Sequence, residues 1–246
     1  MHRFYSPSQN ITSKQIIIDD KSELHHLKDV LRLESNDKVI VFDDEGNEYD
    51  CLVKNIFKKK VVLEIKSKQA PSGKERMALT VACAIPKKLK MDEIIDKLTQ
   101  LGVARIIPLL TERVIVRLDK AKESLKTVRW QKIAMASAKQ SHRSKLPIID
   151  SVRDMKELLL IAKDSFDLKL IPTLLDSKRK SLKEIFCHSN YRNVLVFIGP
   201  EGDFTQEEID LAISSGCIPV SLGKLVLRVE TACIAVASFI RLYENS

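Results

Sequence analysis

The pattern of hydrophobic and polar residues divides the chain into two regions with different periodicities. In residues 1–70, short β-branched runs alternate with polar turns, as in KQIIID, KVIVFD, EYDCLVKNI and KKVVLEIK. The polar segment DDEGNE, around Gly46, indicates a hairpin. Between the first two runs, SELHHLKDVLRL has apolar residues at helical spacing and predicts a helix that starts at Ser22. Short strands with a single helix favour a small β-barrel.

After a polar break at residues 69–75, which we interpret as a linker, strands and helices alternate. Strands are predicted over LTVACAI, ARIIPLL, DLKLIPTLL, NVLVFIG and IPVSLG. Helices are predicted over KMDEIIDKLTQLG, residues 120–141, LKEIFCHS, TQEEIDLAISS and ETACIAVASFIRLY. This alternation predicts an α/β domain with a mostly parallel sheet and helices on both faces. We therefore expect two domains, residues 1–70 and 71–246.

Four of the seven glycines fall within residues 199–223. Gly199 ends a predicted strand, and the next helix begins at the N-cap Thr205 with Glu208 at the capping-box position. Ligands of open α/β sheets bind at the carboxyl ends of strands, where such a loop lies. Gly199 and Gly202 would permit positive φ or a close approach of the backbone to a ligand.

A second glycine loop has the same design, because the run IPVSLG ends at Gly223 and leads through KLVLR into a helix. Glu201 lies in the first loop, and Arg228 and Glu230 lie in the second, so both loops can border one pocket. The dinucleotide fingerprint GxGxxG and the phosphate loop GxxxxGK[ST] are missing from the sequence. Taken singly, each glycine loop is equally well explained by a tight turn between strand and helix.

The charge is unevenly distributed. Residues 71–150 carry 17 Lys+Arg and 8 Asp+Glu, net +9, whereas residues 1–70 carry 12 and 12, and residues 151–246 carry 12 and 13. A basic surface suits a polyanion such as RNA, although a solvated lysine-rich surface has the same composition. The five cysteines form no CxxC pair, which predicts buried, reduced thiols and no metal site. Without a signal-peptide pattern or an apolar run of ~20 residues, we expect a cytoplasmic protein.

Considered together, the two glycine loops are far more specific. IGPEGDFTQEE resembles the GPEGG-type signature, and LGKLVLRVETA the LGxRxLRxETA signature, of the SPOUT class of RNA methyltransferases. Within that class the chain resembles the bacterial 16S ribosomal RNA uridine-N3 methyltransferase family. Further blocks of this family are matched in order by MHRFY, HHLKDVLRL, KMDEIIDKLTQLGVARIIPLLTERV and WQKIAMASAKQSHRSKLP. The resemblance spans nearly the whole chain.

This resemblance implies a C-terminal α/β domain with a trefoil knot, which no strand–helix pattern would predict, and an N-terminal PUA-like β-barrel. It implies a homodimer with the C-terminal helix in the interface, although ETACIAVASFIRLY would equally suit an internal core helix. It implies methylation of N3 of a uridine in the 16S ribosomal RNA of the small ribosomal subunit. The cofactor would be S-adenosylmethionine, bound by three loops through Leu170, Pro172, Ile198, Gly199, Pro200, Gly202, Leu222, Gly223, Leu225 and Leu227.

Removal of the N3 proton from uracil leaves charge on the ring oxygens. Arg228 is the first candidate for holding these oxygens, with a salt bridge to Glu201 or Glu230 as the structural alternative. Glu201 and Glu230 are candidates for accepting the proton, although a loop carboxylate also caps N–H groups, and Glu230 suits a helix start. Placement makes these residues candidate RNA contacts: Arg3, Arg32, Lys87, Lys88, Arg113, Gln140 and Arg143.

Five positions depart from the family pattern. Asp203 replaces the last glycine of GPEGG, so we expect that this position need not have positive φ. Lys139 replaces a Glu and adds positive charge in the basic third, which fits RNA binding. Gln100, Leu225 and Val229 replace Glu, Arg and Thr, the last two in a pocket loop. These departures keep two alternatives open: a SPOUT methyltransferase that acts on another RNA, and a ribosome-associated RNA-binding protein without catalysis. A nucleotide-binding α/β protein is disfavoured because the phosphate loops are missing.

Overall fold

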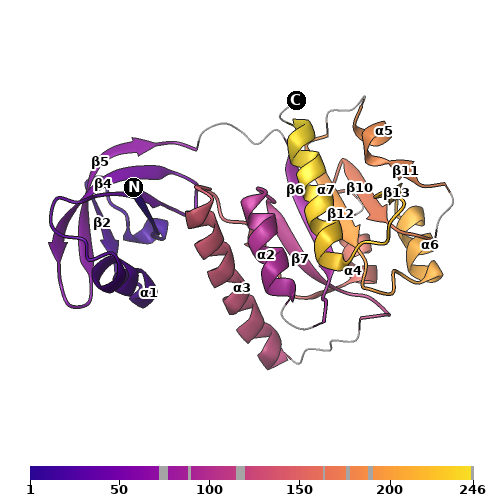
Figure 1. The fold of residues 1–246 in the computed structure, drawn as a ribbon, viewed down its shortest axis with the longest axis horizontal. Helices are drawn as coiled ribbons and strands as arrows, with labels where there is room; N and C mark the ends of the chain where they lie inside the picture. The colour runs from indigo at the N-terminus through magenta and orange to yellow at the C-terminus, as the bar shows by residue number, and fades with distance from the viewer. Residues whose placement is uncertain are drawn as a thin grey trace. The chain divides into compact units, whose positions relative to one another are not determined.

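The computed structural model describes residues 1–71, 77–87, 90–114, 120–162, 164–175, 178–187 and 191–244. The chain forms two compact units (Figure 1), the first comprising Met1–Lys74 with Met135–Leu146 and the second Glu75–Ala134 with Pro147–Ser246. The end of the long helix α3 (Lys120–Gln140) therefore belongs to the first unit. The boundary that we expected from the sequence assigned this helix end to the second domain.

The first unit is a five-stranded sheet in the order β1-β3-β4-β5-β2. Its strands are β1 (His2–Tyr5), β2 (Gln15–Ile18), β3 (Lys38–Phe42), β4 (Glu48–Ile56) and β5 (Val61–Gln69), and a short 3₁₀ helix, η1 (Ser8–Asn10), joins β1 to β2. Four strands were predicted from their β-branched runs. The fifth, β1, has only four residues and pairs in parallel with β3, so no local pattern marks it. Alternate residues of the strands fill the core, among them Val39, Val41 and Leu63.

The helix of the first unit is α1 (Lys21–His25), continued by a π-helical segment, η2 (His26–Val30). Its cap is Asp20 and not Ser22, because Asp20 Oδ1 accepts hydrogen bonds from the backbone N–H groups of Ser22 (2.9 Å) and Glu23 (3.0 Å). Lys139 Nζ lies 2.5 Å from Oε1 of Glu23, whose side chain is only 3% exposed. The charge of Lys139 is therefore paired inside the unit, and its contribution to RNA binding stays a prediction.

The second unit contains a sheet in the order β11-β13-β10-β12-β6-β7-β8, with β9 beside β7. Every pairing in it is parallel, as predicted. The strands are β6 (Ala78–Ala84), β7 (Arg105–Leu110), β8 (Ile148–Ile149), β9 (Arg153–Asp154), β10 (Leu168–Pro172), β11 (Lys180–Ser181), β12 (Asn193–Ile198) and β13 (Ile218–Ser221).

Helices cover both faces of this sheet (Figure 1). On one face, α2 (Lys90–Gln100), α5 (Leu182–Phe186) and α7 (Val229–Glu244) share a core cluster with Trp130 of α3. On the other face, α4 (Met155–Ile161) and α6 (Gln206–Ser214) share a second cluster. The strand β12 alternates between them, because Val194 and Val196 join the first cluster and Leu195 the second. Apolar burial on both faces explains why this strand has no polar alternation.

Four of the five cysteines are buried, as expected, but Cys187 is exposed at the end of α5. Burial raises the pKa of Cys51 and of Cys217 to about 12. Both buried thiols therefore stay protonated at neutral pH. Within the described part of the chain, no helix is both long enough and apolar enough to span a bilayer.

Two connections leave the carboxyl edge of the sheet toward non-adjacent elements. The connection from β10 reaches β11 on the far side of β13. The connection from β13 runs back past β10 to α7, which packs against β12 and β6. Connections that overlap on one edge of a sheet are rare, and this strand order is the one expected of a trefoil-knotted domain. The parallel sheet, this strand order and the separate β-sheet unit confirm the predicted fold class.

Candidate functional site

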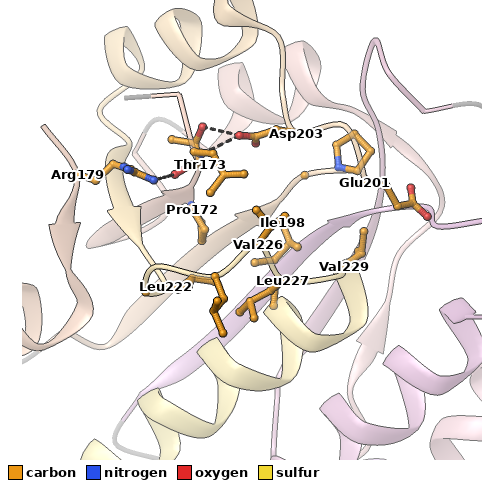
Figure 2. Close-up of a pocket in the computed structure, with 16 residues that line it drawn as sticks. Pro172, Thr173, Arg179, Ile198, Glu201, Asp203, Leu222, Val226, Leu227 and Val229 are labelled. Carbon is orange, nitrogen blue, oxygen red and sulfur yellow. Dashed lines mark hydrogen bonds between the residues drawn. The ribbon is translucent and has the colours of Figure 1, made fainter. Parts of the chain in front are cut away.

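A pocket lies at the carboxyl ends of β10, β12 and β13 (Figure 2), where a doubly wound sheet binds its ligands. Figure 2 shows charged side chains along one side and apolar side chains, near α7, along the other. The lining residues are Pro172, Thr173, Leu174, Arg179, Ile198, Gly199, Pro200, Glu201, Asp203, Leu222, Gly223, Leu225, Val226, Leu227, Val229 and Ala232. We name three loops: the β10 loop (residues 173–175 and 178–179), the β12 loop (residues 199–205) and the β13 loop (residues 222–228).

Eight of the ten residues that we expected to bind a cofactor line this pocket. The two others lie elsewhere: Leu170 is fully buried in the sheet core, and Gly202 is exposed beside Arg113. The sequence analysis did not include Arg179, which lines the pocket from the basic run KRK at residues 178–180. The one signal in the sequence that could have suggested Arg179 is a basic residue in the segment that follows a predicted strand.

The glycines of the β12 loop do not have the positive φ that was one of the two roles we considered for them. Positive φ occurs at Asp203 (61°) and, in the β13 loop, at Gly223 (114°), but not at Gly199 or Gly202. A Cβ atom at Gly199 would lie 3.0 Å from two ring carbons of Phe204, which is fully buried. Gly199 is therefore required by close packing within the protein.

Asp203 has left-handed backbone geometry, so our expectation that this position need not have positive φ is wrong. Asp and Asn tolerate this region better than other residues with a side chain. Its Oδ2 accepts hydrogen bonds from Thr173 Oγ1 (3.0 Å) and from the N–H of Leu174 (2.8 Å), and Oδ1 accepts one from the N–H of Phe204 (2.8 Å). One carboxylate thus joins the β12 loop to the β10 loop.

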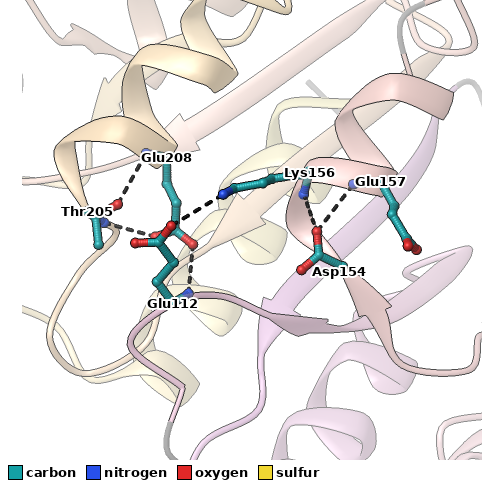
Figure 3. Close-up of polar contacts among 6 residues, drawn as sticks. All are labelled: Glu112, Asp154, Lys156, Glu157, Thr205 and Glu208. Atoms are coloured by element: carbon teal, nitrogen blue, oxygen red, sulfur yellow. Dashed lines mark hydrogen bonds and ion pairs between the residues drawn. The ribbon is translucent and has the colours of Figure 1, made fainter.

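The β12 loop leads into α6 through a fully formed capping box (Figure 3). The buried Glu208 accepts a hydrogen bond from the N–H of Thr205 (2.9 Å) and donates its own N–H to Thr205 Oγ1 (3.2 Å), as the sequence predicted. Its second oxygen accepts from the N–H of Glu112 (2.8 Å). The Glu112 carboxylate lies 3.4 Å from Lys156 Nζ, at the start of α4, which Asp154 caps. The segment after β7 is thereby tied to the loop.

Arg113 holds the β12 loop from the same side. Its Nη1 donates to the carbonyl oxygens of Gly202 (2.5 Å) and Phe204 (3.3 Å). We expected Arg113 to contact RNA. In the structure this guanidinium, although exposed, is engaged with the pocket loop.

Of the three candidate catalytic residues, only Glu201 lines the pocket. It is exposed, and its Oε1 lies 3.5 Å from the N–H of Lys87. Arg228 is exposed at the end of the β13 loop, and among the described side chains it forms no ion pair with Glu201 or Glu230. Glu230 lies in the first turn of α7 and forms an ion pair with Lys90. Burial favours a higher pKa for Glu230, but the Lys90 hydrogen bond and nearby positive charges outweigh it and lower the pKa.

Arg3 is engaged inside the first unit. Its Nη2 lies 2.6 Å from Oε1 of Glu48, its guanidinium stacks 5.5 Å from the centre of the Phe42 ring, and its side chain is 5% exposed. The hydrogen bond from Arg3 is the largest of the effects that lower the pKa of Glu48. This geometry gives Arg3 a structural role.

The remaining candidate RNA contacts lie in both units. Arg32 and Gln140 are exposed in the first unit, and Lys87 is exposed in the second. Arg143 is half-buried, and Lys88 lies outside the described residues. No cluster of three or more potential metal ligands occurs among the residues that the structure describes.

Comparisons with known proteins agree with this architecture. The family described as "RNA methyltransferase domain" matches residues 73–241, and that described as "RNA methyltransferase PUA domain" matches residues 18–66. The ribosomal RNA small subunit methyltransferase E of Mesomycoplasma hyopneumoniae is 33% identical, with 95% of this chain and 96% of the relative covered. The enzyme of the same name from Bacillus subtilis is 29% identical, with 89% and 86% covered.

Solved structures extend the similarity to the whole fold. A methyltransferase of Legionella pneumophila in complex with S-adenosylmethionine is 30% identical and matches with a TM-score of 0.87, covering 98% of this chain and 96% of that chain. The ribosomal RNA small subunit methyltransferase E of Neisseria gonorrhoeae, bound to S-adenosylmethionine, is 27% identical with a TM-score of 0.85, covering 98% and 97%. The chain, which contains a PUA domain and an RNA methyltransferase domain, therefore belongs to the ribosomal RNA small subunit methyltransferase E family.

Proposed function

We propose that this protein transfers the methyl group of S-adenosylmethionine to N3 of a uridine in the 16S ribosomal RNA of the small ribosomal subunit. The pocket between the three loops carries the proposal, because it lies where the fold binds ligands and contains most of the residues that the family resemblance implies. The relatives named as small subunit ribosomal RNA methyltransferases, and the neighbours that hold S-adenosylmethionine, support it.

The residues of the pocket fit S-adenosylmethionine. Ile198, Leu222 and Leu227 offer an apolar surface for an adenine ring. A Cβ atom added at Gly223 would meet nothing within 4 Å, so the backbone there leaves room for a ligand. Arg179 and Glu201 supply charges of both signs for the zwitterionic methionine part. When bound, S-adenosylmethionine supplies an electrophilic methyl group.

The protein's own residues would handle the uracil ring and its proton. The exposed Arg228, which no ion pair neutralises within the described part of the chain, is suited to hold the uracil oxygens and the charge that grows on them. Glu201, at the pocket, is suited to accept the N3 proton. Glu230 is the weaker candidate for a base, because its lowered pKa and its pairing with Lys90 favour a structural role at the start of α7.

The proposed RNA contacts are best supported for Arg32, Lys87 and Gln140, whose side chains are exposed. Arg3 and Arg113 have partners inside the protein that an RNA phosphate would have to replace. The net +9 charge of residues 71–150 favours binding of a polyanion.

We also propose that the protein is a homodimer with α7 in the interface. One face of α7 is buried in the core through Val236, Ala237 and Ile240, while Leu242 is 70% exposed. A large exposed leucine on a core helix is compatible with a partner surface. Sedimentation equilibrium, with Leu242→Glu as the interface variant, would measure the oligomeric state.

A methyl-transfer assay tests the function. Small ribosomal subunits that lack the modification are incubated with the protein and labelled S-adenosylmethionine, and the RNA is digested to nucleosides. Label in 3-methyluridine is the expected result. Label in another nucleoside would contradict the N3 assignment and favour a different RNA methyltransferase. Tight RNA binding without label, on subunits and free RNA alike, would favour a non-catalytic RNA-binding protein.

Arg228→Ala and Lys224→Ala form a matched pair for the role of Arg228, because both side chains are exposed basic groups in the β13 loop. We expect Arg228→Ala to lose activity about 100-fold or more, as for removal of one transition-state hydrogen-bond donor. Lys224→Ala should stay close to the wild-type rate. Equal losses in both variants would assign Arg228 to general charge attraction instead.

A further inference from the structure

We propose that Arg179 binds the carboxylate of the methionine part of S-adenosylmethionine, and so selects this cofactor over ligands that share only its other groups. This inference rests on the proposed function and names a specificity residue for the same pocket. The position lies in the run KRK, residues 178–180, directly before β11.

Arg179 is distinguished from its neighbours by its placement. It is half-buried and lines the pocket, whereas Lys178 and Lys180, on either side of it, are exposed and do not. Among the described lining residues Arg179 is the basic one, and it shares the charged side of the pocket with Glu201 and Asp203 (Figure 2). The chain thus places only the middle residue of this basic run at the pocket.

The guanidinium is held in place by the protein. Its Nη1 donates to the carbonyl oxygen of Thr173 at 2.9 Å. Thr173 is itself fixed, because its hydroxyl donates to Asp203 and its side chain is buried. A network of Asp203, Thr173 and Arg179 therefore orders the β10 loop before any ligand arrives, which lowers the entropy that binding must remove.

The charge of Arg179 has no carboxylate partner among the residues that the structure describes. In the part of the chain that the structure describes, it forms no ion pair with Glu201 or Asp203, although all three line one pocket. A guanidinium has five N–H donors in a planar fork, and one hydrogen bond to a carbonyl oxygen leaves the others. The fork matches a carboxylate in a bidentate arrangement.

The chemistry of S-adenosylmethionine fits a guanidinium at this place. The amino acid end of the cofactor carries an α-carboxylate, and Arg179 lies at one end of the pocket, with Glu201 at the opposite end (Figure 2). Neither adenine nor ribose carries an anion, so the contribution of Arg179 should depend on the carboxylate alone. An RNA phosphate is the competing anion, but the half-buried position in the pocket favours a ligand that enters it.

Binding of two ligands to matched variants tests the proposal. Calorimetry on the full chain measures the Kd of S-adenosylmethionine and of decarboxylated S-adenosylmethionine for the wild type, Arg179→Gln and Lys180→Gln. The decarboxylated compound keeps the sulfonium, the nucleoside and the amine. We expect Arg179→Gln to weaken binding of S-adenosylmethionine about tenfold or more, as for loss of a charge-assisted hydrogen bond, and to leave binding of the decarboxylated compound unchanged.

The controls separate a binding role from a structural one. Lys180→Gln should bind both compounds as the wild type does, and Arg179→Lys should retain part of the preference for the carboxylate. Equal weakening of both compounds by Arg179→Gln would overturn the proposal, because the side chain would then only shape the β10 loop. Unchanged binding of both compounds with weaker binding of 16S RNA would overturn it in favour of a phosphate contact.

Different results of the binding and methylation assays would show that the proposed function itself is wrong. A wild-type protein that binds neither compound would overturn the proposed function and, with it, the role of Arg179. A wild-type protein that binds S-adenosylmethionine but forms no 3-methyluridine would leave the role of Arg179 intact and overturn only the assigned reaction.

Discussion

The β12 loop and the β13 loop border the same pocket but are held in opposite ways. The β12 loop is fixed by side chains: Asp203 joins it to the β10 loop, and Arg113 and Glu208 tie it to the segment after β7. Among the described residues, the side-chain hydrogen bonds to the β13 loop are those between Gly223 and the side chain of Ser221, the last residue of β13. Its Leu225 and Val226 are 79% and 74% exposed, although both line the pocket.

The difference indicates that the two loops contribute to ligand binding in different ways. A wall with many hydrogen bonds is preorganised, so a ligand does not have to order it on binding. Exposed apolar side chains, in contrast, gain free energy when a ligand covers them. We therefore expect changes in the β12 loop to affect the stability of the protein first, and changes in the β13 loop to affect ligand binding first.

The largest effect on stability is expected at Glu208. Glu208→Ala removes the acceptor for two backbone N–H groups, those of Thr205 and Glu112, in a site that is 2% exposed. Unsatisfied buried donors and a lost capping box should lower the free energy of unfolding by about 2–4 kcal/mol. Urea denaturation measures it. Glu207→Ala, one residue earlier and exposed, is the control and should cost much less; equal losses would refute the anchoring role.

The next largest effect is expected at Gly199. Gly199→Ala places a Cβ atom against the buried ring of Phe204, which cannot move without disturbing the core. Overpacking of this kind should lower the free energy of unfolding by about 1–3 kcal/mol and displace the β12 loop, so S-adenosylmethionine should also bind less tightly. Gly202→Ala is the matched control, since its nearest contact is 3.6 Å away. Thermal denaturation that shifts equally in both variants would contradict the packing argument.

An effect of similar size is expected at Asp203, where three substitutions separate backbone geometry from hydrogen bonding. Asp203→Ala loses both the hydrogen bonds and the tolerance for a φ of 61°, and should lower the free energy of unfolding by about 1–3 kcal/mol. Asp203→Gly keeps the geometry and loses the bonds, so it should lie between alanine and wild type. Asp203→Asn should be closest to wild type. A glycine variant as stable as wild type would show that the carboxylate does not join the loops.

The smallest effect on stability is expected at Leu225, in the β13 loop. Because this side chain is exposed, Leu225→Ala should change the free energy of unfolding by less than about 0.5 kcal/mol. Binding of S-adenosylmethionine should weaken about fivefold, which corresponds to about 1 kcal/mol of lost apolar burial. Parallel denaturation and calorimetry measure both quantities. A loss of stability that equals the loss of binding would abolish the contrast between the two loops.

Local sequence patterns were sufficient to predict the structure wherever it is decided by residues that are neighbours along the chain. The capping box of Thr205 and Glu208 lies within one helical turn, and the apolar run of β12 reflects burial on both faces of the sheet. The patterns were not sufficient where two residues could fill one role or where a strand depends on a distant partner. Asp20 caps α1 although Ser22 is also a favourable capping residue, and the four-residue β1 depends on pairing with β3, which lies far along the chain.

The sequence by itself determined the alternation of strands and helices, the glycine loops at the strand ends and the family to which the chain belongs. Only the tertiary structure decided how those loops meet. The positive φ of Asp203, the packing of Gly199 on Phe204 and the anchoring by Arg113 are contacts between residues brought together by the sheet. Arg179 lines the pocket because the sheet places β11, which directly follows it, beside β13 and so near the loop that follows β13. Such contacts depend on sheet topology and side-chain packing, which no periodicity along the sequence encodes.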